Sequence, residues 1–86
     1  SEMDRVQQFL DDCTTRSESS STQASTLYKC YKAWCSEQGD RFPVGSTKFF
    51  MELKRRFKSR KTEAYNEYIG IKINDLGMDL YTRAER

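Results

Sequence analysis

Apolar side chains recur at helical spacing in three separate segments of the chain. The stripes are Val6, Phe9, Leu10 and Cys13; Leu27, Cys30, Tyr31 and Trp34; and Phe49, Phe50, Leu53 and Phe57. A stripe of this kind occupies one side of an amphipathic helix and packs against a core. We therefore predict three core-facing helices.

Residues with known capping roles define the predicted helix ends. Ser25 is the expected N-cap of the second helix, and Gly39 is its left-handed stop. The third helix is expected to begin at Ser46 as N-cap and to run to about Phe57. Pro43 prevents one helix from running through both segments.

Two segments without a helical period are predicted to be loops. Residues 14–23, "TTRSESSSTQ", are rich in Ser and Thr and read as a flexible loop, with at most a short strand near residues 22–24. Residues 40–45 form the second loop, and we expect Phe42 and Val44 to pack back beneath it.

The period changes to two residues after the third helix. Ile69, Ile71 and Ile73 alternate with their neighbours, which predicts a half-buried strand. Residues 59–64 supply the antiparallel partner, with the reversal at residues 65–67 and Asn66 as the turn former.

The 86 residues leave room for one small core. Helices, a turn and a closing hairpin in this order predict a mainly α fold with a small β-hairpin. This is the outline of a winged helix-turn-helix: three helices plus a two- or three-stranded antiparallel wing. We assign residues 1–74 to this domain and expect residues 75–86 to be a loosely docked or frayed tail. The polar start, residues 1–5, suits a domain excised from a larger protein.

Charge changes this picture because it is concentrated in one place. From Lys48 to Lys61 there are seven Lys or Arg and one Glu, a balance of +6, whereas the other 72 residues carry −4. Like charges at this density repel each other, and phosphates would relieve that repulsion. We therefore predict double-stranded DNA as the partner, with the third helix as recognition helix and the hairpin as wing.

The predicted DNA-binding residues lie on the outer face of this helix and on the start of the hairpin. They are Thr47, Lys48, Met51, Lys54, Arg55, Lys58, Arg60 and Lys61. The first-turn residues Thr47, Lys48 and Met51 would reach base edges in a major groove. Phosphate contacts are expected from Lys54, Lys58, Arg60 and Lys61, and Arg55 suits either role.

Other interpretations of the basic run stay open. A run of charge is often only a solvated helix face. Binding of single strands or RNA needs exposed aromatic side chains for base stacking, and an exposed Tyr28 would favour it. Tyr31 and Trp34 are expected in the core instead.

Nothing in the sequence predicts an enzyme, a metal site or a cofactor. The chain has no His, no phosphate-binding loop and no nucleophile elbow. The adjacent Asp11 and Asp12 would point about 100° apart on a helix, too far for a cooperating pair. Cys13, Cys30 and Cys35 lack metal-ligand spacing and are expected as buried thiols in a reducing, intracellular setting. No apolar run approaches the ~20 residues that span a bilayer, so no membrane partner is expected.

Four short patterns, taken in order, resemble a known family. They are V-x-x-F-L at 6–10, L-Y-x-x-Y-x-x-W at 27–34, F-x-x-x-L before a basic end at 49–53, and Y-x-G-I at 68–71. The set is similar to the C-terminal domain of phage and plasmid primase-helicases of the satellite-phage type, which is related to a domain of the poxvirus primase-helicase. The match covers about residues 4–73, mostly at core positions.

The resemblance implies a winged-helix domain that follows a primase and a hexameric helicase and recognises a replication origin. The domain itself would bind DNA without catalysis. Its further partners would be the helicase and primase domains of its parent chain, in the cytoplasm of a bacterium that hosts the phage or mobile element. The alternative is a protein–protein interaction module that docks to the helicase region or to a host replication factor.

Overall fold

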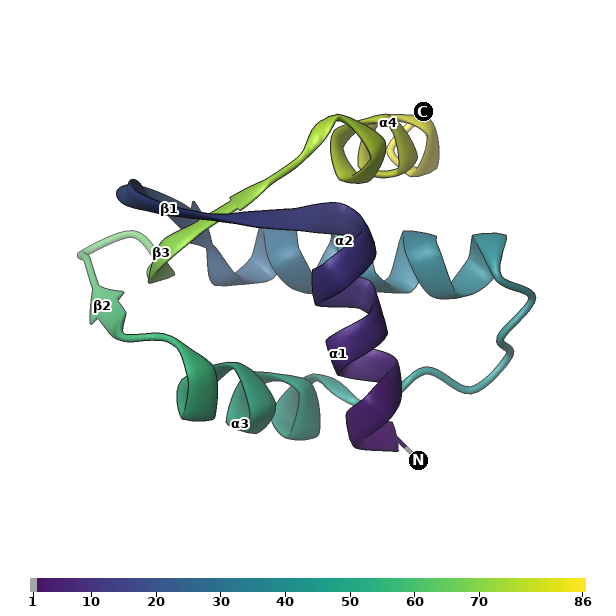
Figure 1. Ribbon diagram of the computed structural model, residues 1–86, viewed down its shortest axis with the longest axis horizontal. Helices are drawn as coiled ribbons and strands as arrows, with labels where there is room; N and C mark the ends of the chain where they lie inside the picture. The colour runs from purple at the N-terminus through teal and green to yellow at the C-terminus, as the bar shows by residue number, and fades with distance from the viewer. Residues whose placement is uncertain (1) are drawn as a thin grey trace.

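The computed structural model describes residues 2–86, with side chains from Arg5 onward. It contains four helices and one three-stranded antiparallel sheet (Figure 1). In chain order the elements are α1 (Glu2–Cys13), β1 (Thr14–Gln23), α2 (Ala24–Glu37), α3 (Ser46–Arg56), β2 (Ser59–Lys61), β3 (Asn66–Ile73) and α4 (Asp75–Ala84).

The helices surround a small core beside the sheet. Figure 1 shows α2 behind the middle of the molecule, α1 crossing in front of it, and α3 and α4 on opposite sides. The strand order is β1-β3-β2, so β1 and β2 are the two edges. The β2–β3 hairpin follows α3 directly and extends from the C-terminal end of that helix.

The three predicted apolar stripes form the core. All of their residues are buried except Phe50, which is half-buried. Phe9, Tyr31 and Phe49 form the aromatic centre, with ring centroids 4.8–6.1 Å apart. Each ring comes from a different helix, so aromatic packing fixes α1, α2 and α3 against one another. The cysteines Cys13, Cys30 and Cys35 are buried free thiols, as predicted.

The predicted loop at residues 14–23 is wrong, because the whole segment forms β1. As an edge strand it is mostly exposed, so it carries no apolar alternation that could reveal it. Arg16 pairs with Ile71 and Ser21 with Ile69, which leaves residues 17–20 as a bulge in the ladder. The serines that suggested a loop therefore lie in a bulged strand.

The predicted alternation on β3 is only partly correct. Ile71 is buried, but Ile69 and Ile73 are half-buried, and Tyr68 is buried instead. Gly70 lies between Tyr68 and Ile71 with a φ of 88°, opposite the β1 bulge. This left-handed backbone interrupts the two-residue period, so side chains three positions apart both face the core.

The hairpin turn lies earlier than predicted. The Thr62 hydroxyl accepts hydrogen bonds from the N–H groups of Ala64 and Tyr65, which closes the turn at residues 62–65. Asn66 is not in the turn: it begins β3 and pairs with Lys61. A threonine performs the local side-chain-to-backbone bonding that we had assigned to Asn66.

The expected frayed or loosely docked tail is also wrong, because residues 75–84 form α4. The side chain of Asn74 caps this helix by accepting from the Gly77 N–H at 2.8 Å. Leu80 is buried against the core, and Gly77 lies directly on the end of α1. Much of this docking uses a residue without a side chain, which explains why the periodicity of the tail was weak.

The helix limits match the predictions within one or two residues. Gln23 and Gly45 are the N-caps of α2 and α3, in place of the predicted Ser25 and Ser46. Gly39 ends α2 as predicted, with a φ of 77°.

One of the two burial predictions for the α2–α3 loop is wrong. Val44 is buried as expected, but Phe42 is 87% exposed. Its N–H donates to Asp40 Oδ1 at 3.0 Å in a local turn that precedes Pro43, and the side chain lies away from the core.

Candidate nucleic-acid interface

The α3 helix separates an apolar face from a basic one. Phe49 and Leu53 are fully buried, and they anchor the helix on α1 and α2. Because the core fixes the rotation of the helix, most of its other positions face solvent, whereas Glu52 is buried and Phe50 and Arg56 are half-buried. All eight residues predicted to bind DNA are exposed: Thr47, Lys48, Met51, Lys54, Arg55, Lys58, Arg60 and Lys61.

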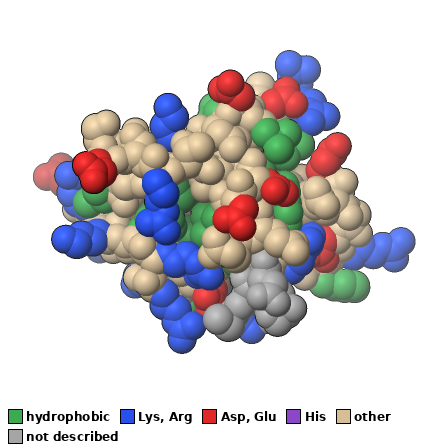
Figure 2. Space-filling model, viewed as in Figure 1, with side chains coloured by type: hydrophobic (Ala, Val, Ile, Leu, Met, Phe, Trp, Pro, Cys, Tyr) green, Lys and Arg blue, Asp and Glu red, His purple; other side chains and the backbone are tan. Residues whose placement is uncertain are grey.

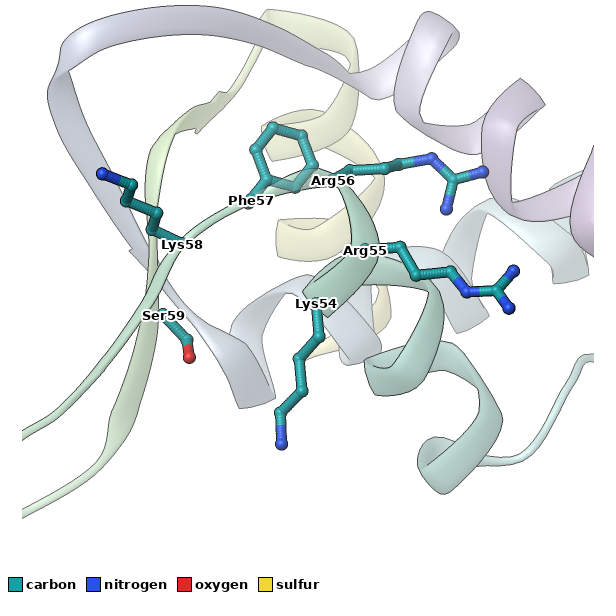
Figure 3. Close-up of a pocket in the computed structure, with 6 residues that line it drawn as sticks. All are labelled: Lys54, Arg55, Arg56, Phe57, Lys58 and Ser59. Atoms are coloured by element: carbon teal, nitrogen blue, oxygen red, sulfur yellow. The ribbon is translucent and has the colours of Figure 1, made fainter.

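An open hollow of about 560 Å³ lies where α3 meets the hairpin. Its lining residues are Lys54, Arg55, Arg56, Phe57, Lys58 and Ser59. In Figure 3, Lys54 and Ser59 point to one side, Arg55 points along a second direction, and Lys58 points to the opposite side from Arg55. The basic side chains therefore fan out around the end of α3 and do not converge on one point.

Arg56 belongs to the same basic run but has a structural role. Its Nε donates to Gln7 Oε1 of α1 at 3.0 Å, and its Nη1 contacts Glu52 Oε1 at 3.1 Å. Only 20% of its side chain is exposed, compared with 65% for Arg55. Glu52, itself buried, thus offsets part of the charge on α3, while Arg56 joins α3 to α1 through Gln7.

Arg60 is exposed but paired within the sheet. Its Nη2 lies 2.8 Å from Oε2 of Glu67 on β3, and the Ser21 hydroxyl of β1 donates to the other carboxylate oxygen. The hydrogen bonds from Ser21 and Arg60 lower the pKa of Glu67. Glu67 was missed in the sequence because an acidic residue in a strand gives no sign of which cation it will meet.

The family of the chain follows from comparison with known proteins. Residues 1–76 match the family described as Poxvirus D5 protein-like. The chain belongs to this family. Membership confirms the resemblance at the family level and makes this a domain related to replication primase-helicases. No match was found among curated proteins or among solved structures.

This D5-like domain has a further guanidinium near the α3–β2 junction that the sequence did not single out. Arg16 of β1 lies over the ring of Phe57, with its Cζ 4.5 Å from the ring centroid. Because residues 14–23 had been predicted as a flexible loop, no fixed place on the surface could be assigned to Arg16.

The D5-like domain gives no support to base stacking on Tyr28. That ring is half-buried against Phe49 and Phe50, at 5.3 and 5.8 Å between centroids. The Tyr28 hydroxyl donates to the Val44 carbonyl at 3.1 Å. An aromatic side chain held in this way does not form the exposed platform that single-strand binding requires.

Two further observations limit the chemistry of the described residues. Across residues 2–86, no helix is long and apolar enough to cross a bilayer. In the same part of the chain, no three His, Cys, Asp or Glu side chains come together in a way that could hold a metal ion.

Proposed function

We propose that this domain is a winged helix that binds double-stranded DNA, with α3 as recognition helix and the β2–β3 hairpin as wing. The main support for this proposal is the orientation of α3 on the core. Phe49 and Leu53 are buried on one side of the helix, so Lys48, Met51 and Arg55 face solvent, and the hairpin follows directly. A helix presented in this way fits a major groove. Family membership adds the context of replication, in which origin recognition is the expected task.

Roles within the interface follow from position along α3. Thr47, Lys48 and Met51 lie on the first turns, where side chains of an inserted helix reach base edges. Met51 is 58% exposed among polar neighbours, and it suits the methyl group of thymine. Lys54, Arg55, Lys58 and Lys61 would hold phosphates, while Arg60 would first have to leave Glu67.

The proposal is tested by measuring binding to a labelled duplex by fluorescence anisotropy at several salt concentrations. If about five or six phosphates are contacted, the slope of log K against log salt is about −5. The double variant Arg55→Glu/Lys58→Glu should lose duplex binding. Its fold should stay native, as checked by circular dichroism, because both side chains are exposed.

The matched control is Arg83→Glu/Arg86→Glu. It makes the same change in net charge, but in and beyond α4, on the opposite side of the molecule from α3 (Figure 1). Retained binding by the control and loss by the α3 variant support the proposed surface. If Arg55→Glu/Lys58→Glu binds the duplex as tightly as wild type, the proposed surface is wrong. A wild-type domain without affinity for any duplex at low salt favours instead a protein-docking role, with the basic face against an acidic surface of the helicase region.

A further inference from the structure

Arg16 is held in place although it lies on an exposed edge strand. Its cross-strand partner on β3 is Ile71, which is fully buried, and its guanidinium stacks on Phe57 at 4.5 Å. Phe57 is itself 8% exposed and is the C-cap residue that follows α3. The packing of Phe57 therefore fixes the position of a cation that the chain could otherwise have left mobile.

The surroundings of Arg16 leave its hydrogen-bonding groups available. A guanidinium that stacks through its flat face keeps its N–H donors at the edge, where they can bind a phosphate through two bonds. Among the side chains described, no carboxylate forms an ion pair with Arg16. Asp11 lines a hollow together with Arg16, and its Oδ1 accepts from Gln7 Nε2 at 2.9 Å.

Phe57 joins Arg16 to the proposed interface. The ring lines the basic hollow at the end of α3, and it also lines a second hollow of about 260 Å³ beside Arg16. Figure 2 shows Lys and Arg side chains in a line on the left half of this face, from the sheet across to α3. The positive surface is thus not confined to α3 and the hairpin tip.

We infer that Arg16 binds a backbone phosphate of duplex DNA, next to the phosphates held by Lys54, Arg55 and Lys58. This inference rests on the proposed function and extends it: the DNA backbone crosses the α3–β2 junction towards β1. Arg16 is therefore a second anchor for the duplex, whereas Arg60 on the hairpin is occupied by Glu67. A phosphate contact of this kind adds affinity without sequence preference.

The test compares Arg16→Ala with Lys72→Ala in the same anisotropy assay. Lys72 pairs with Thr15, the neighbour of Arg16, so it lies one position away on the ladder, and it is also exposed. Each variant removes one positive charge. Arg16→Ala should bind any duplex about 5–10-fold more weakly, with a salt slope smaller by about 1. Lys72→Ala should stay within about twofold of wild type.

The outcomes separate this inference from the proposed function. Unchanged affinity of Arg16→Ala, or an equal loss in Lys72→Ala, overturns the inference, because only net charge would then matter. If Arg55→Glu/Lys58→Glu abolishes binding while Arg16→Ala does not weaken it, the proposed function survives and the inference alone fails. If the wild-type domain binds no duplex, both fail. Circular-dichroism melts of Arg16→Ala show whether its fold is intact, and Arg16→Gln, which keeps more of the packing on Phe57, repeats the measurement if it is not.

Discussion

The Nη2 atom of Arg60 lies 2.8 Å from the Oε2 atom of Glu67, across the β2–β3 hairpin. Ser21 of β1 donates to the other oxygen of the same carboxylate. The Glu67 side chain thus joins all three strands of the sheet, and only 6% of the residue's surface is exposed. Arg60 serves the sheet in this arrangement, and a DNA phosphate would have to compete with Glu67 for it.

Replacing Glu67 by Gln should therefore change stability and DNA affinity in opposite directions. The variant loses the charged partner that joins β1, β2 and β3, so its melting temperature should fall. Arg60 is released, and duplex affinity should rise by about 2–5-fold at low salt because one more cation can meet a phosphate. Thermal melts and anisotropy measure the two effects.

Glu63→Gln is the matched control for Glu67→Gln. Glu63 lies in the exposed turn between β2 and β3 of the same hairpin. Glu63→Gln removes one negative charge, as Glu67→Gln does. An effect of net charge alone would therefore raise the duplex affinity of both variants equally. Equal gains in both variants would contradict a specific competition for Arg60.

The same carboxylate predicts a dependence of stability on pH. Hydrogen bonds from Ser21 and Arg60 hold the pKa of Glu67 below its ordinary value. Its contribution to stability is therefore fully present above the unfolded-state pKa of about 4.3, and it is lost as the pH falls through the lower folded-state value. The difference in melting temperature between wild type and Glu67→Gln should be largest at neutral pH and should shrink below about pH 4. A difference that stays constant across this range would show that the charge of Glu67 is not the cause.

The sequence predicted the elements whose signal is carried by buried side chains. The helical stripes ending at Cys13, Trp34 and Phe57 form or pack against the core, and the helical period of the third stripe correctly predicted that Lys48, Met51 and Arg55 are exposed. These predictions succeeded because burial imposes a period on the sequence. The role of those residues in binding stays a prediction.

The predictions that were wrong or missing concern contacts that do not produce a repeating pattern of apolar residues in the sequence. β1 is an exposed edge strand, and α4 docks through Gly77. Phe42 is apolar but lies outside the core, where hydrophobicity alone gives the wrong expectation. The partners of Arg56 and Arg60 depend on tertiary pairing with Gln7 and Glu67, which no local pattern contains.

Gly77 should be intolerant of even the smallest side chain. A Cβ at this position would lie 2.5 Å from the Cys13 carbonyl oxygen and 2.5 Å from Cγ2 of Ile73. Helix propensity alone would make Gly77→Ala stabilising by about 1 kcal/mol. Overpacking costs about 1–3 kcal/mol or more, and here it acts against backbone that cannot easily move, so we expect net destabilisation.

Urea denaturation of Gly77→Ala, with Thr82→Ala as control, measures this effect. Thr82 lies in the same helix and is exposed, so its replacement should change stability by less than about 0.5 kcal/mol. A Gly77→Ala domain as stable as wild type would show that α4 is not docked as closely as the structure places it.

The neighbours Arg55 and Arg56 should separate binding from stability. Arg55 is 65% exposed, and its contact with Glu52 is a long one of 3.7 Å. Arg55→Gln should therefore weaken duplex binding about 5–10-fold and leave stability within about 0.5 kcal/mol of wild type. Arg56 instead joins α3 to α1 through Gln7, and its loss leaves the buried Glu52 without its closest cation.

Arg56→Gln should consequently destabilise the domain by about 1–3 kcal/mol, with a smaller effect on binding than Arg55→Gln. Chemical denaturation measures the stability of each variant, and anisotropy measures its affinity for the duplex. We expect Arg55→Gln to lose mainly affinity and Arg56→Gln to lose mainly stability. The two substitutions remove the same charge from adjacent positions, so each serves as the control for the other. If both variants lose binding equally and neither loses stability, Arg56 is a surface cation like Arg55, and the tie between α3 and α1 does not operate in solution.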